Sequence, residues 1–122
     1  MRKIIVGSIL SAGVVLAIAC NTDPLACTAQ AVPAIAVSVQ DSASGALAGR
    51  GARVVAKDGA FADTARATSS YDGPYALALE RNGTYTVTVE QQGYRAWSQS
   101  GVSVSRDRCH VRTASLTARL QH

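Results

Sequence analysis

Three cysteines are the residues of this sequence whose type and spacing could do chemistry. Cys20 and Cys27 are seven positions apart near the start of the chain, and Cys109 follows far downstream. A thiol can be acylated, be oxidised to a disulfide or coordinate a metal ion, and the redox compartment decides which of these is accessible. The segment that precedes Cys20 indicates the compartment.

That segment, residues 1–19, has the organisation of a secretory signal peptide. The first three residues carry two positive charges, residues 4–19 are apolar, and Ala17 and Ala19 place small side chains where signal peptidase reads them. The apolar run of about 16 residues is shorter than the roughly 20 that span a bilayer. We expect a signal helix that is removed on export. Because no second apolar run follows, we expect no polytopic membrane protein.

Cys20 directly follows Ala17-Ile18-Ala19 and therefore resembles the modified cysteine in the lipobox of bacterial lipoproteins. The resemblance implies cleavage before Cys20 and a diacylglyceryl group on its sulfur, although the usual leucine stands one place early, at Leu16. The alternative is ordinary cleavage that leaves an unmodified Cys20 at the mature N-terminus. We favour lipidation, because an exposed thiol on an exported chain is prone to oxidation. The expected location is the cell membrane or outer membrane, facing the periplasm or the exterior.

An acylated Cys20 would leave Cys27 and Cys109 as an even pair in an oxidising compartment, which predicts a disulfide between them. A closed loop of this length contributes roughly 4 kcal/mol of stability in the chain-entropy model. The alternatives are a Cys20–Cys27 disulfide and a zinc site. Zinc is disfavoured because His110 adjoins Cys109 and the chain has only one other histidine. No metal or cofactor is expected.

Beyond residue 33 the apolar side chains alternate with period two between glycine-rich turns, which predicts an all-β domain over residues 34–122 after a tether over residues 20–33. The last strand, from Cys109 to Leu120, has a phase break that predicts a bulge near Arg112. This spacing is typical of a seven- to eight-stranded β-sandwich. The expected strands are residues 35–40, 52–57, 61–68, 75–79, 85–89, 94–97, 102–104 and 109–120.

Residues 75–79 and 85–89 are the clearest strands, and their register can be predicted if they form a hairpin. A three-residue loop would pair Leu79 with Tyr85 and Leu77 with Val87, so that all four side chains face inward. A crossover of the chain to the other sheet would void this pairing.

Three short motifs carry a resemblance to a known family: Asp72-Gly73-Pro74-Tyr75, the G-x-Y-x-V-x-V run from Gly83 to Val89, and Gly93-Tyr94. They resemble the carboxypeptidase regulatory-like, or transthyretin-like, domain over about residues 35–105. The resemblance implies a prealbumin-like Greek-key sandwich that serves as an accessory or envelope module. The related hydroxyisourate hydrolase needs early histidines and a Y-R-G-S sequence, which this chain lacks. Turn and packing residues of this kind specify fold rather than activity.

The charge pattern argues against nucleic-acid binding. The formal net charge is +4, and it falls to +2 without the two basic residues of the signal peptide. The remaining basic residues are scattered, whereas a nucleic-acid surface needs a dense patch with aromatic side chains.

A possible ligand surface comprises Tyr94, Trp97 and His110. The alternative, which the residue types favour, is that the two aromatic residues cover one end of the core and that His110 is an exposed strand residue. We expect a non-catalytic cell-envelope lipoprotein whose sandwich is a binding or structural module for an envelope protein or glycan. The alternative is an accessory domain or subunit of an exported carbohydrate- or peptide-processing enzyme. A deep pocket joining His110 to an acidic residue and an arginine would favour an enzyme.

Overall fold

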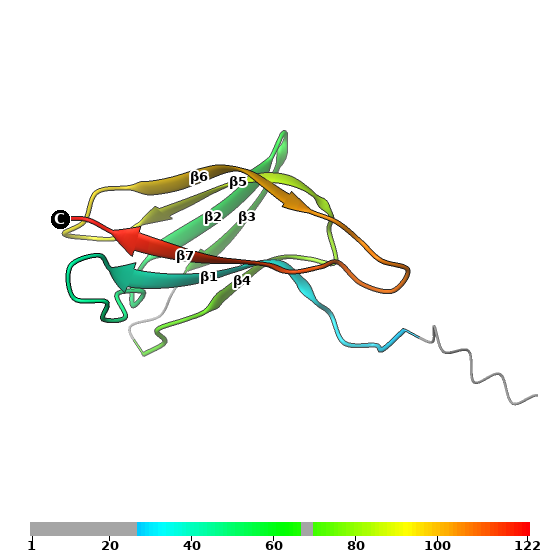
Figure 1. Cartoon of the computed structure of the whole chain (residues 1–122), viewed down its shortest axis with the longest axis horizontal. Coiled ribbons are helices and arrows are strands. Elements are labelled where there is room, and N and C mark those ends of the chain that lie inside the picture. Colours follow the sequence, from blue (N-terminus) through cyan, green and yellow to red (C-terminus); the bar gives the residue numbers. More distant parts are fainter. Residues whose placement is uncertain (1–26, 67–69) are drawn as a thin grey trace, which may run out of the picture.

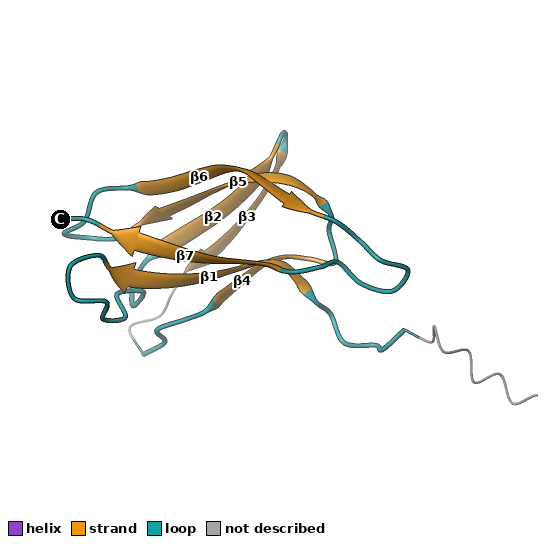
Figure 2. Cartoon of the chain, viewed as in Figure 1, coloured by secondary structure: helices purple, strands orange, loops and turns teal. Residues whose placement is uncertain are grey.

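The computed structural model describes residues 27–66 and 70–122, which form two packed β-sheets (Figure 1). The predicted signal helix and Cys20 lie outside the described residues. Within the described ranges the regular structure consists of strands and contains no helix (Figure 2). The predicted all-β sandwich is therefore confirmed.

Seven strands make up the sandwich. Their bounds are β1 Pro33–Asp41, β2 Arg53–Asp58, β3 Phe61–Arg66, β4 Tyr75–Leu79, β5 Gly83–Glu90, β6 Trp97–Val104 and β7 Ala114–Leu120. One sheet has the order β4-β1-β7 and the other the order β3-β2-β5-β6. The β1–β7 pair is parallel and the other pairs are antiparallel. The edge strands β6 and β7 lie beside each other where the two sheets meet.

The core lies between the sheets because alternate side chains of each strand point inward. In β5, Tyr85, Val87 and Val89 are fully buried, and the residues between them are more exposed. Ile35 and Val37 of β1 meet them from the opposite sheet in the same core cluster. The predicted inward faces of these two strands are therefore confirmed.

The two short strands predicted at residues 94–97 and 102–104 form a single strand, β6, that begins at Trp97. Gly101 has a φ of 67°, and the β5–β6 register shifts between Tyr85 and Val87. A left-handed glycine allows the strand to bend there without ending. The apolar pattern is interrupted at the bend, which is why the sequence suggested two strands.

The condition for the predicted register between residues 75–79 and 85–89 is not met, because β4 and β5 lie in different sheets. Leu77 pairs with Ile35 of β1 and is fully buried, whereas Leu79 is 58% exposed. The strand changes face at Ala78, which has a φ of 55°. The backbone N–H of Ala78 donates a hydrogen bond of 2.8 Å to the carboxylate of Asp63, which belongs to β3 in the other sheet.

The prediction that Cys109 begins the last strand is also wrong. Residues 105–113 form a loop, and β7 begins at Ala114. The Asp107 carboxylate accepts hydrogen bonds from the backbone N–H groups of Cys109 and His110, at 2.8 and 2.9 Å. Such a local bond competes with strand pairing and turns the chain. Within β7 itself Ala118 and Leu120, two positions apart, are fully buried, as period-two alternation requires.

Candidate functional site

The sandwich has two ends with different chemistry (Figure 1). At the disulfide end, residues 27–32 lie against the loop of residues 105–113, and the Sγ atoms of Cys27 and Cys109 are 2.11 Å apart. The predicted disulfide between Cys27 and Cys109 is therefore confirmed. At the loop end, the turns of residues 41–52, 70–74 and 91–96 gather around the last residues of β7.

Glu80 organises the disulfide end. Its Oε1 accepts a hydrogen bond from the N–H of Val32 at 2.9 Å and lies 2.5 Å from Nδ1 of His110. Its Oε2 accepts weaker contacts from the Val111 N–H at 3.4 Å and the Arg106 guanidinium at 3.5 Å. Glu80 has a φ of 53°, an unusual conformation for a residue other than glycine. One carboxylate thus ties the segment before β1 to the loop before β7.

His110 also contacts Thr28, whose Oγ1 is 2.9 Å from Nε2. The order hydroxyl, imidazole, carboxylate is the order found in hydrolase triads. On the sequence alone, a deep pocket joining His110 to an acidic residue and an arginine would favour an enzyme. Glu80 contacts both His110 and Arg106, but neither of the two hollows described below is lined by these residues. The contacts hold the segment of residues 27–32 in place.

The hydrogen bond from His110 is the main cause that lowers the pKa of Glu80 below its ordinary value of 4.5. A carboxylate with a depressed pKa in the folded state stabilises the fold above its unfolded pKa. That contribution disappears as the pH falls through the folded value. The disulfide end should therefore weaken in acid.

We predict that Glu80→Gln lowers the thermal midpoint at pH 7, because a neutral amide cannot bind all four donors as a carboxylate does. The midpoints of the variant and the wild type should converge as the pH falls below 4.5, where Glu80 begins to lose its charge in the unfolded chain. The measurement is a series of thermal melts from pH 7 to pH 3.

The matched control is Glu90→Gln, which neutralises an exposed glutamate whose nearest cation, Arg53, is 3.8 Å away. This variant should melt with the wild type at every pH, because exposed ion pairs of this kind contribute little. A Glu80→Gln deficit that stays constant down to pH 3 would contradict the charge-based explanation.

At the loop end, the carboxylate of Asp41 binds several donors, as Glu80 does at the disulfide end. Its Oδ1 binds the N–H groups of Ala43 and Ser44, and its Oδ2 binds the Tyr94 hydroxyl and the His122 ring, each within 2.9 Å. The backbone hydrogen bond from Ser44, followed by those from Tyr94 and His122, holds the pKa of Asp41 far below its usual range. The hydrogen bond to Asp41 raises the pKa of Tyr94. The Tyr94 ring stacks on the His122 ring, with centroids 4.4 Å apart.

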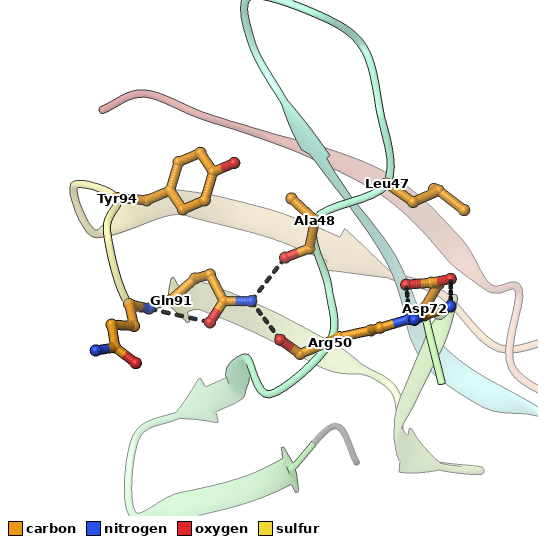
Figure 3. A pocket seen from close by; sticks show the side chains of 7 residues that line it. Leu47, Ala48, Arg50, Asp72, Gln91 and Tyr94 are labelled. Carbon is orange, nitrogen blue, oxygen red and sulfur yellow. Dashed lines mark hydrogen bonds and ion pairs between the residues drawn. The ribbon is translucent and has the colours of Figure 1, made fainter. Parts of the chain in front are cut away.

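A first hollow, which we call the central hollow, lies beside this group of residues and has a volume of about 550 Å³ (Figure 3). Gln91 reaches across it and donates to the carbonyl oxygens of Ala48 and Arg50, at 2.7 and 2.6 Å. The Arg50 guanidinium forms a two-pronged ion pair with Asp72, at 2.8 and 3.1 Å. These polar groups hold the turns of the loop end to one another. The lining residues are Leu47, Ala48, Arg50, Asp72, Gln91, Gln92 and Tyr94.

A second hollow, the edge hollow, lies where strands β6 and β7 approach each other and has a volume of about 410 Å³. The N–H of Arg95 donates to the carbonyl of Gln121 at 2.7 Å and joins the two strands at this point. The lining residues are Arg95, Ala96, Trp97, Ser98, Arg119 and Gln121. This hollow is basic and contains the single tryptophan of the chain.

The predicted ligand surface is divided by the fold. Tyr94 lines the central hollow and Trp97 the edge hollow, and both pack partly against the core. His110 lies at the disulfide end, where it contacts Thr28 and Glu80. Arg95 and Arg119 were not singled out from the sequence. The alternation of β7, which points Ala118 and Leu120 inward, places Arg119 outward and could have drawn attention to it.

Two kinds of feature are absent from the described part of the chain. In residues 27–66 and 70–122, no group of three or more histidine, cysteine or acidic side chains is arranged to hold a metal ion. Nor does any helix in these ranges have the length and apolar character needed to cross a membrane.

Comparison with known proteins identifies the family. The sequence model of the carboxypeptidase regulatory-like domain matches residues 29–120, which include all seven strands and extend beyond the motifs recognised in the sequence. No curated protein and no solved structure matches the chain. Membership of this family indicates a binding or structural module rather than a catalytic domain. The chain belongs to the carboxypeptidase regulatory-like domain family.

Proposed function

We propose that this protein is an exported lipoprotein, anchored through Cys20, whose sandwich binds an envelope component at the loop end. The observation that carries the proposal is the position of Cys27. It is bonded to Cys109 at the disulfide end, whereas both hollows involve residues of the loop end. An anchor placed before Cys27 would leave the hollows facing away from the membrane.

The length of the tether supports this orientation. Seven positions separate Cys20 from Cys27, and an extended chain spans at most about 3.6 Å per residue, so the reach is about 25 Å. The disulfide end would therefore stay within that distance of a membrane that holds Cys20. The loop end would be free to contact a partner, which we propose to be a glycan or a protein of the envelope.

The anchor can be tested in the full chain expressed in a bacterium. We predict that the wild-type protein enters the detergent phase of a Triton X-114 extract, because two or more acyl chains give stable membrane attachment. The intact mass of the mature protein should include a diacylglyceryl group. Cys20→Ser should abolish both the modification and the partitioning.

The matched control is the double variant with Cys27→Ser and Cys109→Ser, which retains Cys20 as its single cysteine. It should still enter the detergent phase, although it lacks the disulfide. A mature wild-type protein that stays in the aqueous phase with an unmodified Cys20 would refute the anchor.

A further inference from the structure

The edge hollow differs from the central hollow in the state of its charged groups. The central hollow contains Arg50 and Asp72, which already bind each other. The lining of the edge hollow contains two arginines, Arg95 and Arg119, and no acidic residue. A ligand of the central hollow would have to break the ion pair between Arg50 and Asp72. A ligand of the edge hollow would instead supply the negative charge that its lining lacks.

Neither guanidinium group forms an ion pair with a described residue. Among the described residues, the arginines in ion pairs are Arg50, Arg53, Arg81 and Arg106, so Arg95 and Arg119 are not among them. The neighbouring carboxylate of Asp41 already receives four donors from its own cluster. Two such guanidinium groups at the rim of a hollow attract an anion, and their planar geometry favours a carboxylate.

Trp97 adds a second kind of contact. It is half-buried, packs against the core and lines the hollow together with the two arginines. An indole offers a flat apolar surface that suits the C–H face of a sugar ring. Ser98 and Gln121 add a hydroxyl and an amide, which can bond to ligand hydroxyls.

We propose that the edge hollow binds an anionic saccharide, with a sugar ring on Trp97 and its carboxylate held by Arg95 and Arg119. The volume of about 410 Å³ lies in the range of small-ligand sites. The hydrogen bond between Arg95 N–H and Gln121 fixes β6 relative to β7, so the site is formed before the ligand arrives. The inference rests on the proposed binding role of the loop end, but it does not need the lipid anchor.

The chain provides its own reporter, because Trp97 is its single tryptophan. The full protein would be titrated in polyoxyethylene-detergent micelles, which carry no sugar headgroups, with tetragalacturonate as the probe. We expect a saturable change in tryptophan fluorescence. Affinity should fall as salt is raised, because the attraction between charges is screened. Maltotetraose, a neutral saccharide of the same length, and inorganic phosphate should each bind at least tenfold more weakly.

The double variant with Arg95→Gln and Arg119→Gln should bind tetragalacturonate at least a hundredfold more weakly, since each lost charge-assisted contact is expected to cost about tenfold. Arg112→Gln, which removes one positive charge at the disulfide end, should bind like the wild type. Thermal melts of all variants would verify folding, and the replaced side chains are exposed.

Four results would overturn the inference. Equal affinity for maltotetraose would show that charge is not recognised, and equal affinity for phosphate would show a plain anion site. Unchanged affinity in the double arginine variant, or no response of the folded wild type, would remove the edge hollow as the site. Failure of the Cys20 experiment alone would refute the anchor and leave this binding result intact.

Discussion

Replacing Cys27 and Cys109 with serine is expected to lower the free energy of unfolding by about 4 kcal/mol. The two cysteines are separated by 82 positions, so their bond removes much of the freedom of the unfolded chain. Single domains are stable by only about 5–15 kcal/mol in total. The loss should lower the thermal midpoint by roughly 20 °C.

The measurement is urea denaturation of the full chain at pH 7, followed by thermal melts. The wild-type protein treated with a reductant should behave like the double variant, because both lack the same bond. Cys20→Ser is the control, since Cys20 takes no part in the disulfide, and its denaturation midpoint should equal that of the wild type. A double variant within about 0.5 kcal/mol of the wild type would show that the disulfide contributes little.

Leu77→Ala is expected to cost about 2–5 kcal/mol, whereas Leu79→Ala should stay within about 0.5 kcal/mol of the wild type. The two leucines belong to the same strand and are two positions apart. Leu77 is completely buried between the sheets, so truncation leaves a cavity, but Leu79 is 58% exposed and packs against little. The pair is a matched test of the change of face at Ala78.

Urea denaturation of the two variants under identical conditions measures the difference directly. Similar costs for both would mean that β4 alternates regularly and that Leu79 is buried. That result would contradict the change of face at Ala78.

The corrected placement of β4 explains why the disulfide end exists as a unit. Because β4 pairs with β1, the chain after Leu79 must cross to the other sheet, and Glu80 lies at the crossing. There its carboxylate reaches the segment before β1 and the loop before β7. A hairpin with β5 would have placed Glu80 in an ordinary turn.

Each end of the sandwich is held together by one carboxylate that accepts several hydrogen bonds. At each end one carboxylate, Glu80 or Asp41, accepts hydrogen bonds from backbone N–H groups and contacts a histidine that is distant in the sequence. Hydrogen bonds to a charged group are the stronger ones, and both carboxylates are held in the ionised form. The disulfide end adds a covalent bond, while the loop end leaves the edge hollow with two arginines that form no ion pair with a described residue.

The sequence alone determined the local properties of this protein. Period-two alternation predicted the inward faces of β1 and β5, because the side chain's direction in a strand depends only on position. The pairing of Cys27 with Cys109 followed from counting cysteines, on the expectation that the chain is exported and that Cys20 is acylated. The turn and packing motifs around Tyr75 and Tyr85 were sufficient for the family.

The tertiary structure decided which distant residues meet. The sheet to which β4 belongs depends on the left-handed turn at Ala78 and on its hydrogen bond with Asp63, and alternation encodes neither. The separation of His110 from Tyr94 and the meeting of Arg95, Trp97 and Arg119 follow from the crossovers between sheets. Such contacts are non-local: periodicity specifies the face of each strand, but its neighbour is selected by the packing of the whole chain.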